Sequence, residues 1–368
     1  MNTTIPFNPN IPSLLEDLAM DLNFAHADYM NALIKARTEL AELKGYSHSA
    51  PNPLLLISPA VIREAVASSR IEHIQTTVEN VLKGQLYQGV EQNEPDKEVL
   101  MYGRAIQWAA SEMKTIPIST RLILGIHKRL MPENSPGFRK IQNSIVNQKT
   151  GKVVYTPPIA SRIPKLMQGL EKFIHSNTPH IDPLIKCALL HYQFESIHPF
   201  SDGNGRVGRM LMVLYLIQEN ILTIPILFIS GYINRNRSEY YKLLNEVSTK
   251  KKWKEFVLYM LKGFYLQAKE TKDNLFKIMD YYNELREKIK FRHKKIYSTE
   301  LLDTLFNYPV ISPVRMGIQM KIHYTTATRY LDELTRGKIL QEEFVGKYHL
   351  YFNRKLVSIM NENLIELN

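Results

Sequence analysis

The chain has 368 residues, 44% hydrophobic and 23% charged, which is typical of a globular protein with two or three domains. No apolar run approaches the roughly 20 residues of a membrane span, and residues 1–10 show no secretory signal. The single cysteine, Cys187, excludes an internal disulfide, so we expect a cytoplasmic protein without a membrane contact. The net charge of +11 favours anionic partners such as nucleotides or nucleic acid, although lysines scattered over the surface would give the same figure.

The N-terminal part of the chain is predicted to be helical. Hydrophobic residues at helical spacing predict a helix over residues 13–44. Ser58-Pro59, a capping residue followed by Pro at the first helical position, predicts the start of a second helix that ends within 68–73. A third helix is expected over 77–86, and the polar stretch 89–95 predicts a domain boundary.

The middle of the chain is expected to stay helical, with one β-hairpin. Two β-prone runs around the turn Lys149-Thr-Gly-Lys152 predict this hairpin. Helices are predicted over 96–130 (two, broken at Pro117), 164–175, 183–197, 207–220, 232–250 and 251–290 (again two).

The last part of the chain has the pattern of a winged helix. A basic run over 286–295 predicts a boundary, and beyond it the elements expected are helices over 299–306, from Ser312-Pro313 and over 325–335, then a hairpin over 344–352. The predicted organisation is an N-terminal helical region (1–95), a core (96–250), connecting helices (251–290) and a winged-helix domain (291–368).

A winged helix predicts a possible contact with DNA. The residues expected at the exposed start of its recognition helix and at its wing tip are Lys321, His323, Thr325, Thr326, Arg329 and Lys347. Asp332 and Glu333 on the same helix favour the alternative, a module that binds proteins or packs against another domain.

The stretch His198-Pro-Phe-Ser-Asp-Gly-Asn-Gly-Arg-Val-Gly-Arg209 concentrates chemically active residues between two predicted helices. Gly203 and Gly205 let the backbone approach a ligand, and free N–H groups at a helix start attract anions. The run 203–208 also matches the dinucleotide pattern GxGxxG. That pattern needs a preceding strand, and a helix is predicted here, so we exclude a dinucleotide fold.

Four side chains of this stretch suit nucleotide transfer. Arg206 and Arg209 lie three apart, share a helix face, and fit a polyphosphate. Asp202 offers an oxygen ligand to a cation that bridges phosphates. His198 is placed to take a proton from an incoming hydroxyl.

The stretch resembles the signature HxFx[DE]GNGRxxR of the Fic family. Every fixed position is filled, by His198, Phe200, Asp202, Gly203, Asn204, Gly205, Arg206 and Arg209. The resemblance covers roughly residues 10–250. Within it, 136–158 resembles the flap that registers a target's side chain, with candidate target-binding residues Ser144, Ile145, Val146 and Asn147. Tyr240-Tyr241 resembles the pair that lines the adenine pocket.

The resemblance implies a mainly α fold, with a Fic-type helical core, a small β-hairpin flap and a C-terminal winged helix-turn-helix. It implies transfer of AMP from ATP, with Mg²⁺, to a Tyr, Thr or Ser hydroxyl of a target protein or of the chain itself, and is compatible with a homodimer. By resemblance, His198 is the base, Asp202 the Mg²⁺ ligand, Phe200 the anchor of the loop, 203–205 the holder of the α-phosphate region, and Arg206 with Arg209 the β- and γ-phosphate ligands. The Gly-Asn-Gly form favours AMP transfer over the Doc-like kinase branch, while a phosphocholine transferase branch stays open.

Residues Ser68 to His73 resemble the inhibitory motif [ST]xxxE[GN] of self-inhibited Fic proteins. Ser68 and Glu72 match, whereas His73 stands where the motif has Gly or Asn. The resemblance implies that Glu72 pairs with Arg209 and denies it to the γ-phosphate. Some inhibited Fic proteins also remove AMP, so reversal is a further expectation. The alternative function is a DNA-binding regulator in which the loop only senses nucleotide.

Overall fold

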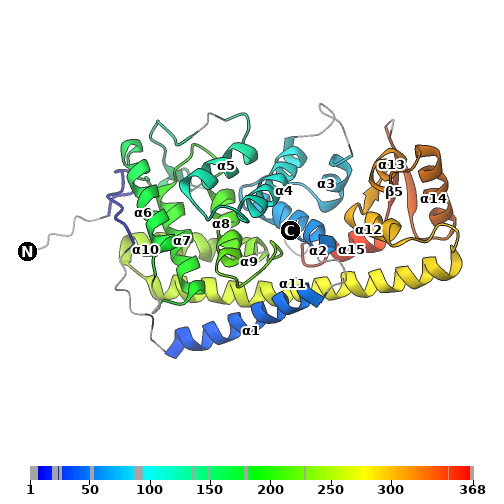
Figure 1. Cartoon of the computed structure of the whole chain (residues 1–368). Helices are drawn as coiled ribbons and strands as arrows, with labels where there is room; N and C mark the ends of the chain where they lie inside the picture. The colour runs from blue at the N-terminus through cyan, green and yellow to red at the C-terminus, as the bar shows by residue number, and fades with distance from the viewer. Residues whose placement is uncertain are drawn as a thin grey trace, which may run out of the picture. The chain divides into compact units, whose positions relative to one another are not determined.

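The computed structural model describes residues 7–18, 24, 27–49, 54–86, 94–134, 137–147, 150–177, 181–227, 229–346 and 348–364. Over these residues the fold is mainly α-helical, with two small antiparallel sheets, which confirms the predicted fold class (Figure 1). The predicted turn residue Lys149 and wing-tip residue Lys347 lie outside the described residues. No helix in this part of the chain is long and apolar enough to span a bilayer.

The chain forms two compact units, each assembled from separate stretches of sequence. Unit 1 comprises Met1–Ala41, Arg104–Pro225 and Tyr232–Ala268, and unit 2 comprises Glu42–Gly103, Ile226–Gly231 and Lys269–Asn368. Four of the five unit boundaries fall inside helices, α1 (Ala27–Ser49), α4 (Glu94–Glu112), α9 (Ile229–Arg235) and α11 (Trp253–Arg292), and the fifth follows Pro225. The domain limits expected at 95, 250 and 290 stay a prediction.

Unit 1 is built around two buried helices, α7 (Pro183–Ile197) and α8 (Asn204–Gln218). Asp182 caps α7 as predicted, because its side chain accepts the N–H of Leu184 at 2.8 Å. A Cβ on Gly208 would lie 3.1 Å from Phe194, so the glycine lets α8 approach α7 closely. The remaining elements are α5 (Thr120–Leu130), a 3-10 turn (Ala160–Arg162), α6 (Ile163–His175), α10 (Arg237–Lys250) and the confirmed hairpin of β1 (Ile145–Val146) and β2 (Val153–Tyr155).

Unit 2 contains the C-terminal module in the predicted order of helix, helix–turn–helix and hairpin. The N-terminal helices of unit 2 are α2 (Leu54–Ile71) and α3 (Val78–Gly84). The C-terminal elements are α12 (Thr299–Asn307), β3 (Val310–Ile311), α13 (Pro313–Met320), α14 (Tyr324–Arg336), β4 (Gln341–Val345), β5 (Tyr348–Phe352) and α15 (Arg354–Asn361). Ser312 caps α13 as predicted. The short strand β3 and the helix α15 were not predicted, and β3 pairs with β5 to give the strand order β3-β5-β4.

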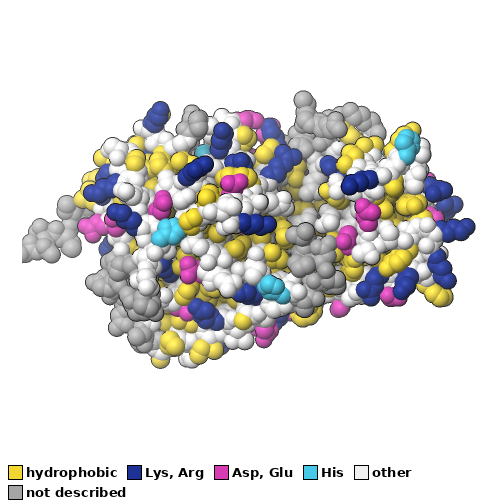
Figure 2. All heavy atoms as spheres, viewed as in Figure 1, with side chains coloured by type: hydrophobic (Ala, Val, Ile, Leu, Met, Phe, Trp, Pro, Cys, Tyr) yellow, Lys and Arg dark blue, Asp and Glu magenta, His cyan; other side chains and the backbone are white. Residues whose placement is uncertain are grey.

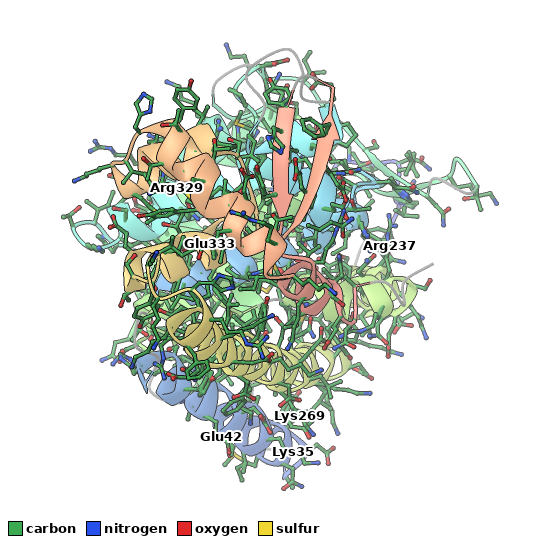
Figure 3. All side chains as sticks on the ribbon, turned by 90° about the vertical axis from the view of Figure 1, so that its right-hand side faces the viewer. Lys35, Glu42, Arg237, Lys269, Arg329 and Glu333 are labelled. Atoms are coloured by element: carbon green, nitrogen blue, oxygen red, sulfur yellow. The ribbon has the colours of Figure 1, made fainter. Side chains whose placement is uncertain are left out.

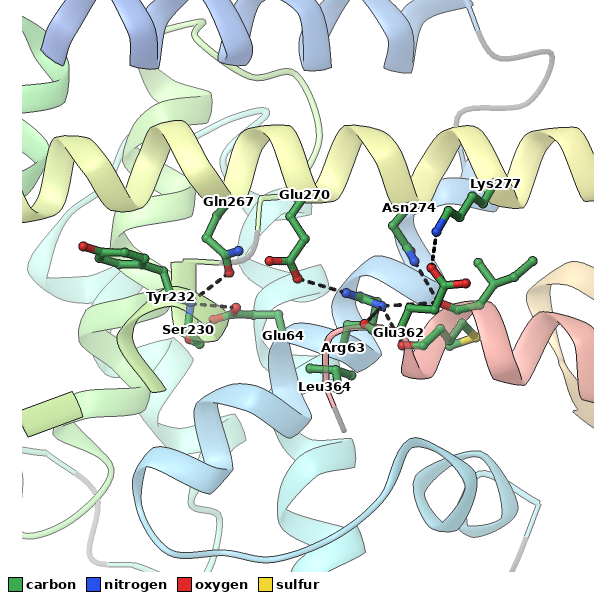
Figure 4. Close-up of polar contacts among 12 residues, drawn as sticks. Arg63, Glu64, Ser230, Tyr232, Gln267, Glu270, Asn274, Lys277, Glu362 and Leu364 are labelled. Carbon is green, nitrogen blue, oxygen red and sulfur yellow. Dashed lines mark hydrogen bonds and ion pairs between the residues drawn. The ribbon is translucent and has the colours of Figure 1, made fainter. Parts of the chain in front are cut away.

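Within unit 2, buried charged residues of α2 join this helix to the end of α15 (Figure 4). The Arg63 guanidinium donates to the carbonyl oxygens of Met360 at 2.7 Å and Glu362 at 3.0 Å, and lies 3.4 Å from the Glu270 carboxylate. Glu64 accepts hydrogen bonds from the hydroxyls of Tyr102 and Ser230. Because a helix end leaves its last carbonyls without partners, Arg63 acts as a side-chain cap for α15.

Four predictions of helix extent were wrong. The stretch predicted as one helix over 232–250 forms two helices, α9 and α10, which are separated at Asn236. Residues 13–18 are not helical; the Leu15 and Glu16 carbonyls, which a helix would use for its own hydrogen bonds, accept instead from the Arg162 and Gln193 side chains at 2.9 and 2.8 Å. The helix predicted from Ser58-Pro59 begins earlier, at Leu54, and contains Pro59, because apolar residues before Ser58 are buried and extend it. The stretch 251–290 forms the single helix α11, in which no proline interrupts a buried apolar face.

Candidate active site

His198 lies at the end of α7, where its backbone adopts the left-handed conformation of a tight turn. It is the C-cap of the helix, with φ 48° in the left-handed region, and its N–H donates to the Phe194 carbonyl at 3.0 Å. Two residues on, Phe200 is fully buried and stacks on His127 with 3.8 Å between ring centroids. The loop therefore leaves the helix sharply and is anchored in the core by Phe200, the contact that the signature implied.

Asn204 holds the loop closed from inside. Its Oδ1 accepts the N–H of Phe200 at 2.8 Å, and its Nδ2 donates to the Phe200 carbonyl at 2.9 Å. The same Nδ2 lies 3.2 Å from Nδ1 of His198. The described contacts of Asn204 thus fix the loop and the histidine, and its expected part in holding a phosphate stays a prediction.

Gly203 is a position where a side chain would not fit. Its φ is 80°, and a Cβ would lie 3.2 Å from the Met131 side chain. Its N–H donates to Oδ1 of Asp202 at 2.6 Å, while the Asp202 side chain stays 66% exposed. Burial lowers the pKa of His127, so its ring is neutral. Its Nε2 lies 3.1 Å from the Asp202 carbonyl oxygen, an acceptor, so Nε2 carries the proton and donates to the loop.

Arg206 and Arg209 make the start of α8 strongly positive. Their side chains are only 2% and 1% exposed, and Arg206 lies 3.8 Å from the Asp202 carboxylate. A helix N-terminus adds its own partial positive charge. Two buried guanidinium groups at such an end favour an anionic ligand with several oxygens. The structure thus brings together the arginines, the carboxylate and His198, as the sequence predicted.

Behind this end of α8 lies His191, which the sequence reasoning missed. Burial, reinforced by the charge of Arg209, lowers the pKa of His191 to about 3, so the ring is neutral. Its Nε2 lies 2.7 Å from the hydroxyl of Tyr240. Tyr240 is buried, whereas Tyr241 is 42% exposed, and their ring centroids are 5.2 Å apart. The tyrosine pair is therefore formed, and its expected contact with adenine stays a prediction.

Arg139 and Asn143 connect the base of the hairpin to His198, and sequence reasoning missed both. The buried Arg139 guanidinium donates to the carbonyls of His198 at 2.9 Å and Pro158 at 2.5 Å, and the Arg139 N–H donates to the Pro199 carbonyl at 2.9 Å. Nδ2 of Asn143 lies 3.2 Å from Nδ1 of His198. Arg139 stood inside the recognised flap segment, but its partners His198 and Pro199 lie about 60 residues away and have no local signal.

The candidate target-binding residues of the flap lie in or beside β1. Ser144 is engaged within the hairpin, since its hydroxyl lies 3.0 Å from that of Thr156. Ile145 and Val146 form β1, and Val146 is 47% exposed. Asn147 follows the strand and closes the turn through its backbone. These positions fit the expected role, which stays a prediction.

The end of α2 explains the form of the inhibitory motif. The N–H of Ile74 donates to the Ser69 carbonyl at 3.0 Å, and the N–H of His73 donates to the Arg70 carbonyl at 3.1 Å. This is the Schellman pattern, which places Glu72 at the C-cap and requires a left-handed residue next. His73 is that residue, with φ 65°, where Gly or Asn is usual.

Ser68 is buried in α2 and Glu72 is half-buried at its end, both in unit 2. Arg209 belongs to unit 1. The pairing of Glu72 with Arg209 stays a prediction.

The metal expected here would have one protein carboxylate as its ligand. In the part of the chain that the structure describes, no three His, Cys, Asp or Glu side chains converge into a metal cage. Mg²⁺ in nucleotide sites is bound through one or two carboxylates and the phosphates of the substrate. The exposed Asp202 carboxylate, beside two buried arginines, fits that mode of binding.

These features describe a helical domain with an anion-binding helix start beside a histidine, and family comparisons agree. The Fic/DOC family model matches residues 117–216, and the Fic/DOC N-terminal model matches residues 30–111. A third model, the C-terminal domain of SoFic-like protein adenylyltransferases, matches residues 281–356. The chain belongs to the Fic/DOC family.

Relatives with assigned names are adenylyltransferases. A probable protein adenylyltransferase from Aquifex aeolicus strain VF5 is 31% identical over 189 residues, which is 50% of this chain and 53% of that protein. Protein adenylyltransferase Fic from Drosophila melanogaster is 28% identical over 245 residues, which is 60% of this chain and 46% of that protein. The chain thus spans about half the length of these relatives.

Solved structures share the fold. A Fic family protein from Desulfovibrio desulfuricans G20 aligns with a TM-score of 0.56 and 20% identity, over 87% of this chain and 95% of that one. Fic-1 from C. elegans aligns with a TM-score of 0.52 and 17% identity, over 67% of this chain and 73% of that one.

Proposed function

We propose that this protein is a self-inhibited protein adenylyltransferase, which moves AMP from ATP to a Tyr, Thr or Ser hydroxyl of a target protein or of itself. One observation carries the proposal: His198 is held beside a helix start that contains two buried arginines, Arg206 and Arg209. The family models and the adenylyltransferase names of the relatives support it.

The proposal gives each group a task in the transfer. Arg206, Arg209 and the N–H groups of 204 and 205 bind the phosphates, in keeping with the charge and burial of the arginines. The Gly203 N–H, which here donates to Oδ1 of Asp202, would have to leave that carboxylate to join them. Asp202 would hold Mg²⁺, which when bound neutralises phosphate charge. Nε2 of His198 takes the proton of the acceptor hydroxyl, whose oxygen bonds to the α-phosphorus. The bond from that phosphorus to the bridging oxygen breaks, and pyrophosphate leaves with the bond electrons.

Regulation is assigned to the end of α2. Glu72 stands at the C-cap, and pairing with Arg209 would remove the arginine from the γ-phosphate. The proposal therefore includes low basal activity, and the same carboxylate would position water if the enzyme also removes AMP. A cytoplasmic location and a homodimer are further parts of the proposal.

Labelling with ATP tests the function. With α-labelled ATP and Mg²⁺, we expect weak self-labelling of the native chain, stronger labelling of Glu72→Gly, and none when His198→Ala is added. Gln75→Ala, an exposed change three residues from Glu72, is the matched control and should label like the native chain. No gain in Glu72→Gly would refute the inhibition, and label persisting without His198 would refute the base.

The choice of label separates the branches of the family. AMP transfer moves the α-label and not a γ-label, whereas a kinase does the reverse. A labelled phosphocholine donor that gave product under the same conditions would replace the proposal with phosphocholine transfer.

The alternative of a DNA-binding regulator gains no support from the relatives named above. The two carboxylates of α14 lie within the module's own contacts, since Asp332 accepts from the Tyr351 hydroxyl at 2.6 Å and Glu333 lies 3.1 Å from His293. Arg329 and Glu333 occupy the same helix in Figure 3. Lys and Arg side chains are spread across the face shown in Figure 2, so the net charge does not single out this module.

A further inference from the structure

The ring nitrogen Nδ1 of His198 has two carboxamides as neighbours. Nδ2 of Asn143 and Nδ2 of Asn204 each lie 3.2 Å from it. A neutral imidazole carries at Nδ1 either one hydrogen or one lone pair, and the other nitrogen, Nε2, carries the opposite. The partner of Nδ1 therefore decides whether Nε2 can take a proton.

The two carboxamides are not equally constrained. Asn204 is fixed by its reciprocal hydrogen bonds with the Phe200 backbone, so its Nδ2 must face His198 and favours a lone pair on Nδ1. Asn143 has no such bonds, and its Oδ1 is buried and without a hydrogen-bond partner among the described residues. A half-turn of the Asn143 carboxamide exchanges its two end atoms and places Oδ1 beside Nδ1.

We propose that Asn143 is a positioning residue that selects the reactive tautomer of His198. In this arrangement Oδ1 of Asn143 accepts the hydrogen of Nδ1, which leaves the lone pair on Nε2 for the acceptor hydroxyl. The inference rests on the proposed function only for the use of Nε2 as the base. The exchange gives the buried Oδ1 of Asn143 a donor and moves Nδ2 to the place that Oδ1 occupied, while Asn204 keeps its bond to the Phe200 carbonyl.

Arg139 ties the start of the segment that carries Asn143 to the loop. It ties the segment to the His198 carbonyl at one end and to Pro158 at the other, so the hairpin base and the loop form one hydrogen-bonded group. An uncharged acceptor has a clear advantage over a carboxylate here. A carboxylate would raise the pKa of His198 and protonate the base at a higher pH.

Two variants of Asn143 test the proposal in the Glu72→Gly background. Asn143→Ala removes the Asn143 carboxamide and leaves that of Asn204 beside Nδ1, so we expect kcat to fall about 10- to 100-fold, part of what a general base contributes, with KM for ATP unchanged. Asn143→Asp keeps an oxygen acceptor, so we expect kcat within about threefold of the parent at high pH. The acidic limb of the kcat–pH profile of Asn143→Asp should move to higher pH. The added carboxylate raises the pKa of His198, so the base becomes protonated at a higher pH than in the parent. Lys140→Ala, an exposed neighbour, is the control.

Nitrogen NMR of ¹⁵N-histidine-labelled full-length protein reads the tautomer directly, with His198→Ala used for assignment. We expect Nδ1–H in the parent and Nε2–H in Asn143→Ala. Nε2–H in the parent, or an unchanged tautomer in Asn143→Ala, would overturn the proposal. So would an Asn143→Asp protein less active than Asn143→Ala at all pH values. The NMR experiment needs no turnover. Failure of every variant to label would therefore count against the proposed function, while the NMR result would still decide the tautomer of His198.

Discussion

Replacing His73 by glycine should stabilise the end of α2. His73 occupies the left-handed position of the Schellman turn, at φ 65°. A residue with a Cβ in that region is strained by roughly 1–2 kcal/mol, and glycine is not. Glycine also gains more freedom in the unfolded chain, which costs about 0.5–1 kcal/mol. The difference is a net stabilisation of about 0.5–1 kcal/mol.

Hydrogen exchange at the two cap amides measures this effect locally. The N–H groups of His73 and Ile74 close the turn, so residue 73 as glycine should slow their exchange about two- to fivefold, the equivalent of that free energy. Urea unfolding should report the same sign. His73→Val should act in the opposite direction, since a β-branched residue tolerates the left-handed region poorly.

Gln75→Gly is the matched control, because Gln75 has no positive φ and glycine there only loosens the unfolded chain. We expect it to be neutral or destabilising. If His73→Gly and Gln75→Gly lowered stability equally, the His73 side chain would contribute more than its backbone strain costs, and the cap argument would fail. Under the proposed inhibition, a firmer cap beside Glu72 should also lower basal labelling.

Two buried ionisable side chains, His191 and Arg63, give further predictions. The His191 pKa of about 3 lies below its unfolded value, so protonation of the unfolded chain should destabilise the protein as pH falls below about 6.5. Between pH 7.5 and 5, the free energy of unfolding in urea should fall by up to about 2 kcal/mol more in the native chain than in His191→Gln. Equal falls in the two proteins would refute the assignment. Arg63→Ala should lower the free energy of unfolding in urea by about 3 kcal/mol, because it removes a buried charge and leaves the α15 carbonyls without their donor. The control, Lys277→Ala, breaks an exposed pair with Glu362 and should lower it by under about 1 kcal/mol.

Helix starts were predictable where the signal is local. Asp182 and Ser312 cap helices as expected, because a cap needs only its own next few residues. Ser58-Pro59 carries the same signal and failed, because burial of the apolar residues before it extends α2 to Leu54. Tertiary packing there outweighs the cap, and no local pattern announces it.

The residues of the candidate site that lie within one continuous sequence signature could be predicted. The loop from His198 to Arg209 was recognised residue by residue, and the structure holds its histidine, carboxylate and arginines at one helix start. Arg139, Asn143 and His191 were missed because their roles depend on contacts with residues distant in sequence. The Gly or Asn of the inhibitory motif was a readable hint of a left-handed turn at His73.

Two helices of this protein end in a histidine with a left-handed backbone, and the comparison shows why the strain persists in one of them. At His73 the left-handed backbone closes the turn, and glycine would adopt that conformation without strain. At His198 the same turn must carry an imidazole, and glycine would remove the proposed base. The strain at His198 is offset by hydrogen bonds to the Phe194 carbonyl in α7, from Arg139 at the hairpin base, and to its ring nitrogen from Asn143 or Asn204. The hydrogen-bonded frame around His198 therefore exists to hold a side chain, not a turn.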